Sequence, residues 1–144
     1  MNTYEELQEE ACNDGIEIID NYAFKSELIS GLYCDSTIAL SKKLKRTTEK
    51  KCVLAEELGH HYTAVGDITD QSTVENRKQE MRGRIVAYNK LVGLRGIVDA
   101  YLHHCQSISE SAEYLEVTEE FLIDSLNYYR NKYGVYTKLD NYVI

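Results

Sequence analysis

The spacing of hydrophobic residues changes along the chain, and this change predicts the order of its structural elements. Residues 3 to 13 repeat at the period of an amphipathic helix. The isoleucines between residues 16 and 19 then indicate a strand, and residues 31 to 40 indicate a hairpin that turns near residues 35 and 36. We therefore expect the first third of the chain to form one helix and a small antiparallel sheet.

Hydrophobic residues in the middle of the chain recur at helical spacing. Thr47 is a suitable N-cap for a helix over residues 48 to 63, and Gly66 is the expected stop signal. A capping box at residues 72 to 75 begins a second helix, which runs to residue 93. A small sheet followed by these helices predicts an α+β fold.

The last third of the chain is expected to be helical. A capping box at residues 107 to 110 opens one helix, and Thr118 caps a long helix that ends near Gly134. Their lengths are those of a helix-turn-helix, but acidic residues open the second helix and would face DNA phosphates with the wrong sign. These helices are therefore expected to pack within the fold or against a protein partner, and residues 135 to 144 to form a terminal strand or an interaction tail.

Length and composition indicate a single domain over residues 1 to 144. A chain of 144 residues, 43% of them hydrophobic, is long enough to bury one core. Residues 1 to 93 are expected to hold the sheet and the first helices, and residues 94 to 144 to form a helical subregion. No run of 18 apolar residues and no signal-peptide pattern occurs, so we expect a cytoplasmic protein without membrane contact.

Cysteine usage agrees with a reducing compartment. The four cysteines show no Cys-x-x-Cys spacing. They are Cys12, Cys34, Cys52 and Cys105. We expect reduced and mostly buried thiols rather than disulfides or a zinc knuckle.

The distribution of charge argues against direct binding of nucleic acid. The chain has a formal net charge of -8, whereas affinity for phosphates needs clustered Lys and Arg. Residues 42 to 51, which we call the basic strip, are the exception: they carry six positive and one negative side chain, so the strip is +5 and the remaining chain -13. A solvated loop is the preferred explanation, and the functional alternative is that the strip holds an acidic stretch of a protein substrate.

The candidate chemistry lies in residues 55 to 61, Ala-Glu-Glu-Leu-Gly-His-His. They match the zinc-protease helix motif His-Glu-x-x-His except that Glu56 occupies the place of the first histidine. Glu56 and His60 share one helix face, and Glu57 occupies the general-base position. A glutamate can ligate zinc, but two carboxylates and one imidazole cancel the charge of the ion and make it a weaker Lewis acid. The alternative is an acidic helix face that ends in two histidines.

A third metal ligand is expected from the second helix. Glu80 follows His60 by 20 residues, the arrangement of zinc peptidases with a glutamate as third ligand. An exposed glutamate within residues 76 to 80 is the alternative. His61 allows a second pair with Glu57, which we rank lower because it leaves no glutamate in the base position, so His61 is interpreted as a second-shell or substrate-facing residue.

Two longer segments, residues 52 to 67 and 76 to 91, resemble the ImmA/IrrE family of metallo-endopeptidases, in particular the short forms carried by prophages and integrative elements. The similarity extends over most of the chain, through residues 112 to 121 and 133 to 136. It implies a zincin-like core in which a small antiparallel sheet precedes the motif helix and a helical C-terminal half follows. Gly83 stands at the small-residue position of the family's second motif.

The resemblance also implies a mechanism and a partner. Glu56, His60 and Glu80 would bind zinc or another divalent metal, and Glu57 would be the catalytic glutamate. The implied substrate is a helix-turn-helix repressor of the same mobile element, so that the enzyme acts as an anti-repressor. Glu56 departs from the family's usual histidine, and the alternative is a catalytically inactive protein of the same fold that binds a repressor or another protein.

Overall fold

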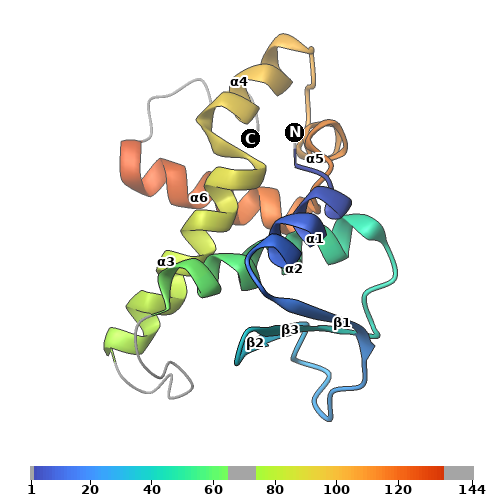
Figure 1. Cartoon of the computed structure of the whole chain (residues 1–144). Helices are drawn as coiled ribbons and strands as arrows, with labels where there is room; N and C mark the ends of the chain where they lie inside the picture. The colour runs from blue at the N-terminus through green and yellow to red at the C-terminus, as the bar shows by residue number, and fades with distance from the viewer. Residues whose placement is uncertain (1, 65–73, 135–144) are drawn as a thin grey trace. The chain divides into compact units, whose positions relative to one another are not determined.

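The computed structural model describes residues 2 to 64 and 74 to 134; for residues 74 to 76 it describes the backbone but not the side chains. These residues form an α+β fold of six helices and one three-stranded sheet (Figure 1). None of the six helices is long and apolar enough to cross a lipid bilayer. The chain divides into two compact units, Met1–Ala87 and Tyr88–Ile144. The single-domain expectation stays a prediction.

The first unit contains the sheet and the motif helix. The N-cap Thr3 and Glu6 form a capping box at the start of its first helix, so the helix predicted over residues 3 to 13 is confirmed. The elements in chain order are α1 (Tyr4–Asn13), β1 (Glu17–Tyr22), β2 (Gly31–Cys34), β3 (Thr37–Ser41), α2 (Thr47–Thr63) and most of α3 (Val74–Leu91), whose last four residues belong to the second unit.

The sheet has the strand order β1-β3-β2 and is mixed, so the prediction of an antiparallel sheet is wrong for one of its two pairings. Strands β2 and β3 form the predicted antiparallel hairpin, closed by Asp35 and Ser36 with φ of 49° and 57°. Strand β1 pairs with β3 in parallel, with Ile18 opposite Ile38. Strand β3 is the central strand of the sheet. Its residues Ile38 and Leu40 are fully buried, and an apolar strand is stabilised most when strands pair with it on both sides.

Among the described residues, α1 and α2 lie on one and the same face of the sheet. Ile38 and Leu40 of β3 are buried with Leu7 of α1 and Leu58 of α2, and Figure 1 shows both helices on the same side of the sheet. On the other face, Ile19 and Leu32 flank Ala39 in one cross-strand row and are partly exposed. The core of this unit therefore lies between the sheet and the motif helix.

The motif helix α2 begins one residue earlier than predicted, at Thr47 rather than at residue 48. Arg46 is the N-cap, because Glu49 accepts hydrogen bonds from the backbone N–H groups of Lys45 and Arg46 at 3.2 and 3.0 Å. The helix ends at Thr63, whose hydroxyl donates to the carbonyl of Gly59. The predicted stop at Gly66 and the start of the capping box at residue 72 lie outside the described residues.

The second unit contains the C-terminal helices α4 (Gly93–Leu102), α5 (Ile108–Leu115) and α6 (Glu119–Tyr133). Ser107 and Thr118 cap α5 and α6, as predicted. The carboxylate of Glu110 accepts from the N–H of Gln106 and not from Ser107, so the predicted box is only half formed. The inward face of α6 contains four buried apolar or aromatic residues, Phe121, Leu122, Leu126 and Tyr129. The predicted strand or tail over residues 135 to 144 lies outside the described residues.

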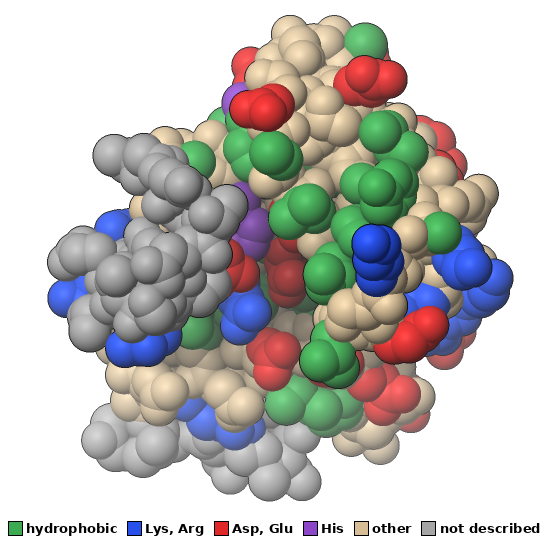
Figure 2. Space-filling view, turned by 90° about the horizontal axis from the view of Figure 1, so that it is seen from below, with side chains coloured by type: hydrophobic (Ala, Val, Ile, Leu, Met, Phe, Trp, Pro, Cys, Tyr) green, Lys and Arg blue, Asp and Glu red, His purple; other side chains and the backbone are tan. Residues whose placement is uncertain are grey.

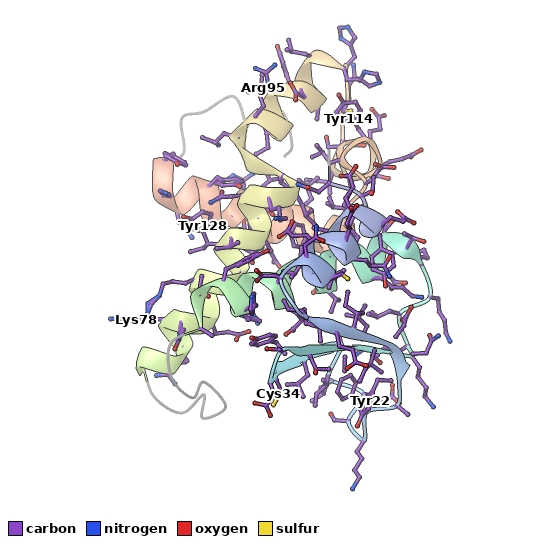
Figure 3. All side chains as sticks on the ribbon, viewed as in Figure 1. Tyr22, Cys34, Lys78, Arg95, Tyr114 and Tyr128 are labelled. Carbon is purple, nitrogen blue, oxygen red and sulfur yellow. The ribbon has the colours of Figure 1, made fainter. Side chains whose placement is uncertain are left out.

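The four cysteines are free thiols, which confirms the absence of a disulfide framework among them. Cys52 and Cys105 are buried, but Cys12 and Cys34 are exposed, so the expectation of mostly buried thiols holds for two of four. Cys34 is exposed because it ends β2 at the hairpin turn, where Figure 3 labels it.

We expect Tyr129 to make the second unit sensitive to alkali. Burial raises the pKa of Tyr129 from 10.0 to about 12, and its hydroxyl donates to Asn89 Oδ1 at 2.8 Å. The raised pKa means that the folded state favours the neutral phenol, so this contribution to stability is complete below pH 10 and lost as the pH rises through about 12. Urea unfolding of the wild type and Tyr129→Phe across this range should show a smaller alkaline loss in the variant. Tyr101→Phe, at an exposed position, is the control, and parallel pH curves for wild type and Tyr129→Phe would contradict the assignment.

Candidate functional site

Helices α2 and α3 meet at two glycines. A Cβ atom on Gly59 would lie 2.1 Å from the backbone oxygen of Gly83, and a Cβ on Gly83 would lie 2.1 Å from Nδ1 of His60. No side chain fits at either position without displacing backbone or ring, so the two helices approach more closely than other residues permit. This contact places His60 directly against α3.

The structure brings His60 and Glu80 together, as the family resemblance implied. Nε2 of His60 lies 3.2 Å from Oε1 of Glu80, and Nε of Arg84 lies 3.7 Å from the same oxygen. His60 is buried at 6% exposure, and Glu80 is only partly exposed, so the alternative of a solvated glutamate does not hold. Figure 2 shows a histidine next to acidic side chains near the middle of the face it presents. Arg84, one turn after Glu80, was not singled out from the sequence, although its i, i+4 spacing was the available signal.

The charges of His60 and Glu80 are coupled. Burial opposes protonation of His60, but the hydrogen bond to Glu80 and the negative charges of Glu57, Glu80 and Glu56 outweigh it and raise the pKa of the ring. The hydrogen bond from His60 holds the pKa of Glu80 below its ordinary value despite burial. The pair therefore favours a negative carboxylate beside a ring that carries or shares a proton.

Glu57 projects from α2 toward the sheet. A Cβ on Gly31 of β2 would lie 3.3 Å from Cγ of Glu57, so the absence of a side chain at Gly31 leaves room for this glutamate. Burial raises the pKa of Glu57 to about 7, against the opposing charge of His60. A carboxyl group with such a pKa can both accept and release a proton near neutral pH.

His61 makes two hydrogen bonds within the protein. Its Nδ1 lies 2.7 Å from the hydroxyl of Tyr33 on β2, and its Nε2 bonds to the carboxylate of Asp14 after α1. Both ring nitrogens are thus hydrogen-bonded within the protein, which argues against the alternative metal pair of Glu57 and His61. Tyr33 and Asp14 carried no signal in the sequence, because only the fold brings three separate elements to one ring.

The geometry of His60 and Glu80 fits two neighbouring ligands of one metal ion. Ligand atoms at the usual zinc distances lie about 3.3 Å apart in a tetrahedral site, close to the 3.2 Å observed. Nδ1 of His60 is buried and has no hydrogen-bond partner among the described residues, and a role in catalysis or ion binding is one explanation of such an unsatisfied atom.

Glu56 lies one helical turn before His60, and its charge contributes to the raised pKa of that ring. Within residues 2 to 64 and 74 to 134, no three His, Cys, Asp or Glu side chains already stand together as a metal site. Glu56 as the third ligand therefore stays a prediction, and it is the residue at which this sequence departs from the usual motif.

Comparison of the chain with protein-family models, curated proteins and solved structures finds no match.

Proposed function

We propose that the chain is a metal-dependent endopeptidase with a zincin-like core, in which His60, Glu80 and Glu56 hold zinc or another divalent metal and Glu57 is the general base. The observation that carries this proposal is the 3.2 Å approach of His60 to Glu80 beside a glutamate whose pKa is raised to about 7. Resemblance to the ImmA/IrrE peptidases supports it from the sequence. A divalent ion bound there would polarise the scissile carbonyl and acidify a water molecule.

Side chains of the protein transfer the proton and hold the proposed metal ligands in position. Glu57 accepts a proton from the attacking water while the water oxygen bonds to the carbonyl carbon, and Glu57 then delivers that proton to the leaving amine. Glu80 is held by Arg84, and His60 by its burial against Gly83, so both side chains are fixed before substrate arrives.

The sheet offers a place for an extended substrate. β2 lies at an edge of the described sheet, and its first residue, Gly31, lies beside Glu57. A peptide that adds a strand to this edge would form backbone hydrogen bonds with few side-chain demands and pass the general base. The substrate that the resemblance suggests is a helix-turn-helix repressor of a prophage or mobile element, cleaved in the cytoplasm by the chain as an anti-repressor.

Metal analysis tests the ligand set. Protein purified without chelator is expected to contain about one equivalent of divalent metal, and Glu80→Ala is expected to lose most of it, because second-shell changes alone cost 10–100-fold in affinity and a ligand costs at least about as much. Glu113→Ala, an exposed glutamate on α5, is the matched control. Metal retained in full by Glu80→Ala would show that the ion, if bound, lies elsewhere.

A second candidate function is a catalytically inactive binding module of the same fold. It is favoured by Glu56, which weakens the Lewis acidity of any bound ion, and by the lack of a preformed set of three ligands in the described parts of the chain. Protein without metal that still binds a repressor stoichiometrically would support this candidate. Metal-dependent cleavage would exclude it.

A further inference from the structure

A hollow of about 270 Å³ lies beside the end of β3, away from His60. We call it the lysine hollow. It is lined by Phe24, Ser26, Glu27, Ser41, Lys42, Lys43 and Lys45. Its walls come from the loop between β1 and β2 and from the first part of the basic strip, which the proposed chemistry does not use.

The lysines that line the hollow carry the positive charge of the basic strip that is not neutralised by the ion pairs of the strip. Arg46 pairs with Glu49, Lys50 pairs with Asp20 at 3.2 Å, and Lys51 is buried. Three lysines remain at the hollow, and no carboxylate among the described residues forms an ion pair with them. They face one lining glutamate, Glu27, so the hollow is positive within a chain of net charge -8. Such a local field attracts anionic groups.

The wall of the hollow is fixed by hydrogen bonds. Nζ of Lys43 donates to the backbone oxygen of Glu27, and the hydroxyl of Ser41 accepts from the N–H of Lys43 at 3.2 Å. The hydroxyl of Ser26 accepts from the N–H of Leu28 at 3.1 Å. Each serine keeps a hydroxyl proton that it can donate to a ligand. A bound carboxylate would thus meet ammonium groups and hydroxyl donors together.

The position of the hollow relates it to the proposed peptidase site. Ser41 donates its N–H to Ser30 at 2.8 Å, immediately before Gly31 at the start of β2. Lys45, which lines the hollow, directly precedes the N-cap Arg46, and Glu57 lies about three helical turns beyond Arg46, or about 16 Å along α2. An extended peptide covers that distance in about five residues. One polypeptide lying along the edge of β2 can therefore reach both places.

We propose that the lysine hollow binds an acidic side chain of the polypeptide substrate, about five residues from the bond that is cleaved. This inference rests on the proposed function for its relation to a cleaved bond. The binding itself requires only charge complementarity between the three lysines and a carboxylate. The expected ligand is thus a peptide rich in Glu or Asp.

Peptide binding measured without cleavage tests the inference. The probe is a fluorescein-labelled peptide with a run of four glutamates, compared by anisotropy with the same peptide carrying glutamines. In a Glu57→Gln background, Lys42→Glu with Lys45→Glu is expected to weaken binding of the glutamate peptide by about tenfold at low salt and less at physiological salt. Both lysines are exposed and use only their backbone N–H in the fold, so the double variant is expected to fold.

The matched control is Lys78→Glu with Lys132→Glu, which changes the net charge equally at two other exposed lysines. Figure 3 shows Lys78 extending outward from α3. Equal affinities of the two double variants would overturn the inference, as would equal affinities of the two peptides for the parent protein. If the lysines govern binding but the wild type cleaves no peptide, the lysine hollow stands as a binding site and the proposed peptidase function falls.

Discussion

Glu57→Gln is expected to lower kcat/KM for peptide cleavage by about 10²–10⁴-fold and to leave the metal content unchanged. Glutamine has the shape of glutamate but cannot accept the proton of the attacking water. Glu57 is not among the proposed ligands, and its side chain lies beside Gly31 of the sheet. Cleavage of a labelled peptide, with metal analysis of the same samples, measures both quantities.

Glu9→Gln is the matched control, because Glu9 is an exposed glutamate on α1 of the same unit. The control is expected to cleave at the wild-type rate. Equal cleavage by wild type and Glu57→Gln would remove Glu57 from the mechanism. Loss of metal together with activity would instead identify Glu57 as a ligand.

Gly59→Ala is expected to lower the free energy of unfolding of the first unit by about 3 kcal/mol. The added methyl group would meet the carbonyl of Gly83 at 2.1 Å, and this neighbour is backbone, which cannot rotate away. Alanine favours a helix by about 1 kcal/mol over glycine, so the clash must exceed that gain. Urea unfolding followed by circular dichroism measures the change.

Gly96→Ala supplies the comparison for this effect. Gly96 is also helical, but its Cβ would lie 3.2 Å from Cδ2 of Leu115, the end of a flexible side chain. We expect the free energy of unfolding of the Gly96→Ala variant to stay near the wild-type value or to rise slightly. A Gly59→Ala protein as stable as Gly96→Ala would mean that the two helices cross with more room than the structure shows.

Much of the candidate site could be predicted from local sequence. Helical periodicity and the motif residues predicted α2, and the family resemblance, rather than the spacing alone, implied that Glu80 would lie near His60. The N-terminal helix and the hairpin were predicted correctly for the same reason. Each depends on residues close together in the chain.

The features of the fold and of the candidate site that were not predicted depend mostly on contacts between segments far apart in the sequence. Nothing in the sequence placed Tyr33 and Asp14 on His61, because the three residues come from separate elements that only the completed fold brings together. The parallel pairing of β1 was missed because pattern gives the faces of a strand but not its neighbours. Arg46 became the N-cap because a carboxylate three residues later satisfied its N–H group, which outweighed the preference for threonine.

The strand order has a consequence for how the first unit folds. The hairpin of β2 and β3 closes over only two residues and can form within microseconds, whereas β1 must bring together residues about twenty positions apart before it gains a partner. The early hairpin already contains Gly31 and Tyr33, which later contact the motif helix. The surface against which the motif helix docks can thus be assembled before the last strand joins the sheet.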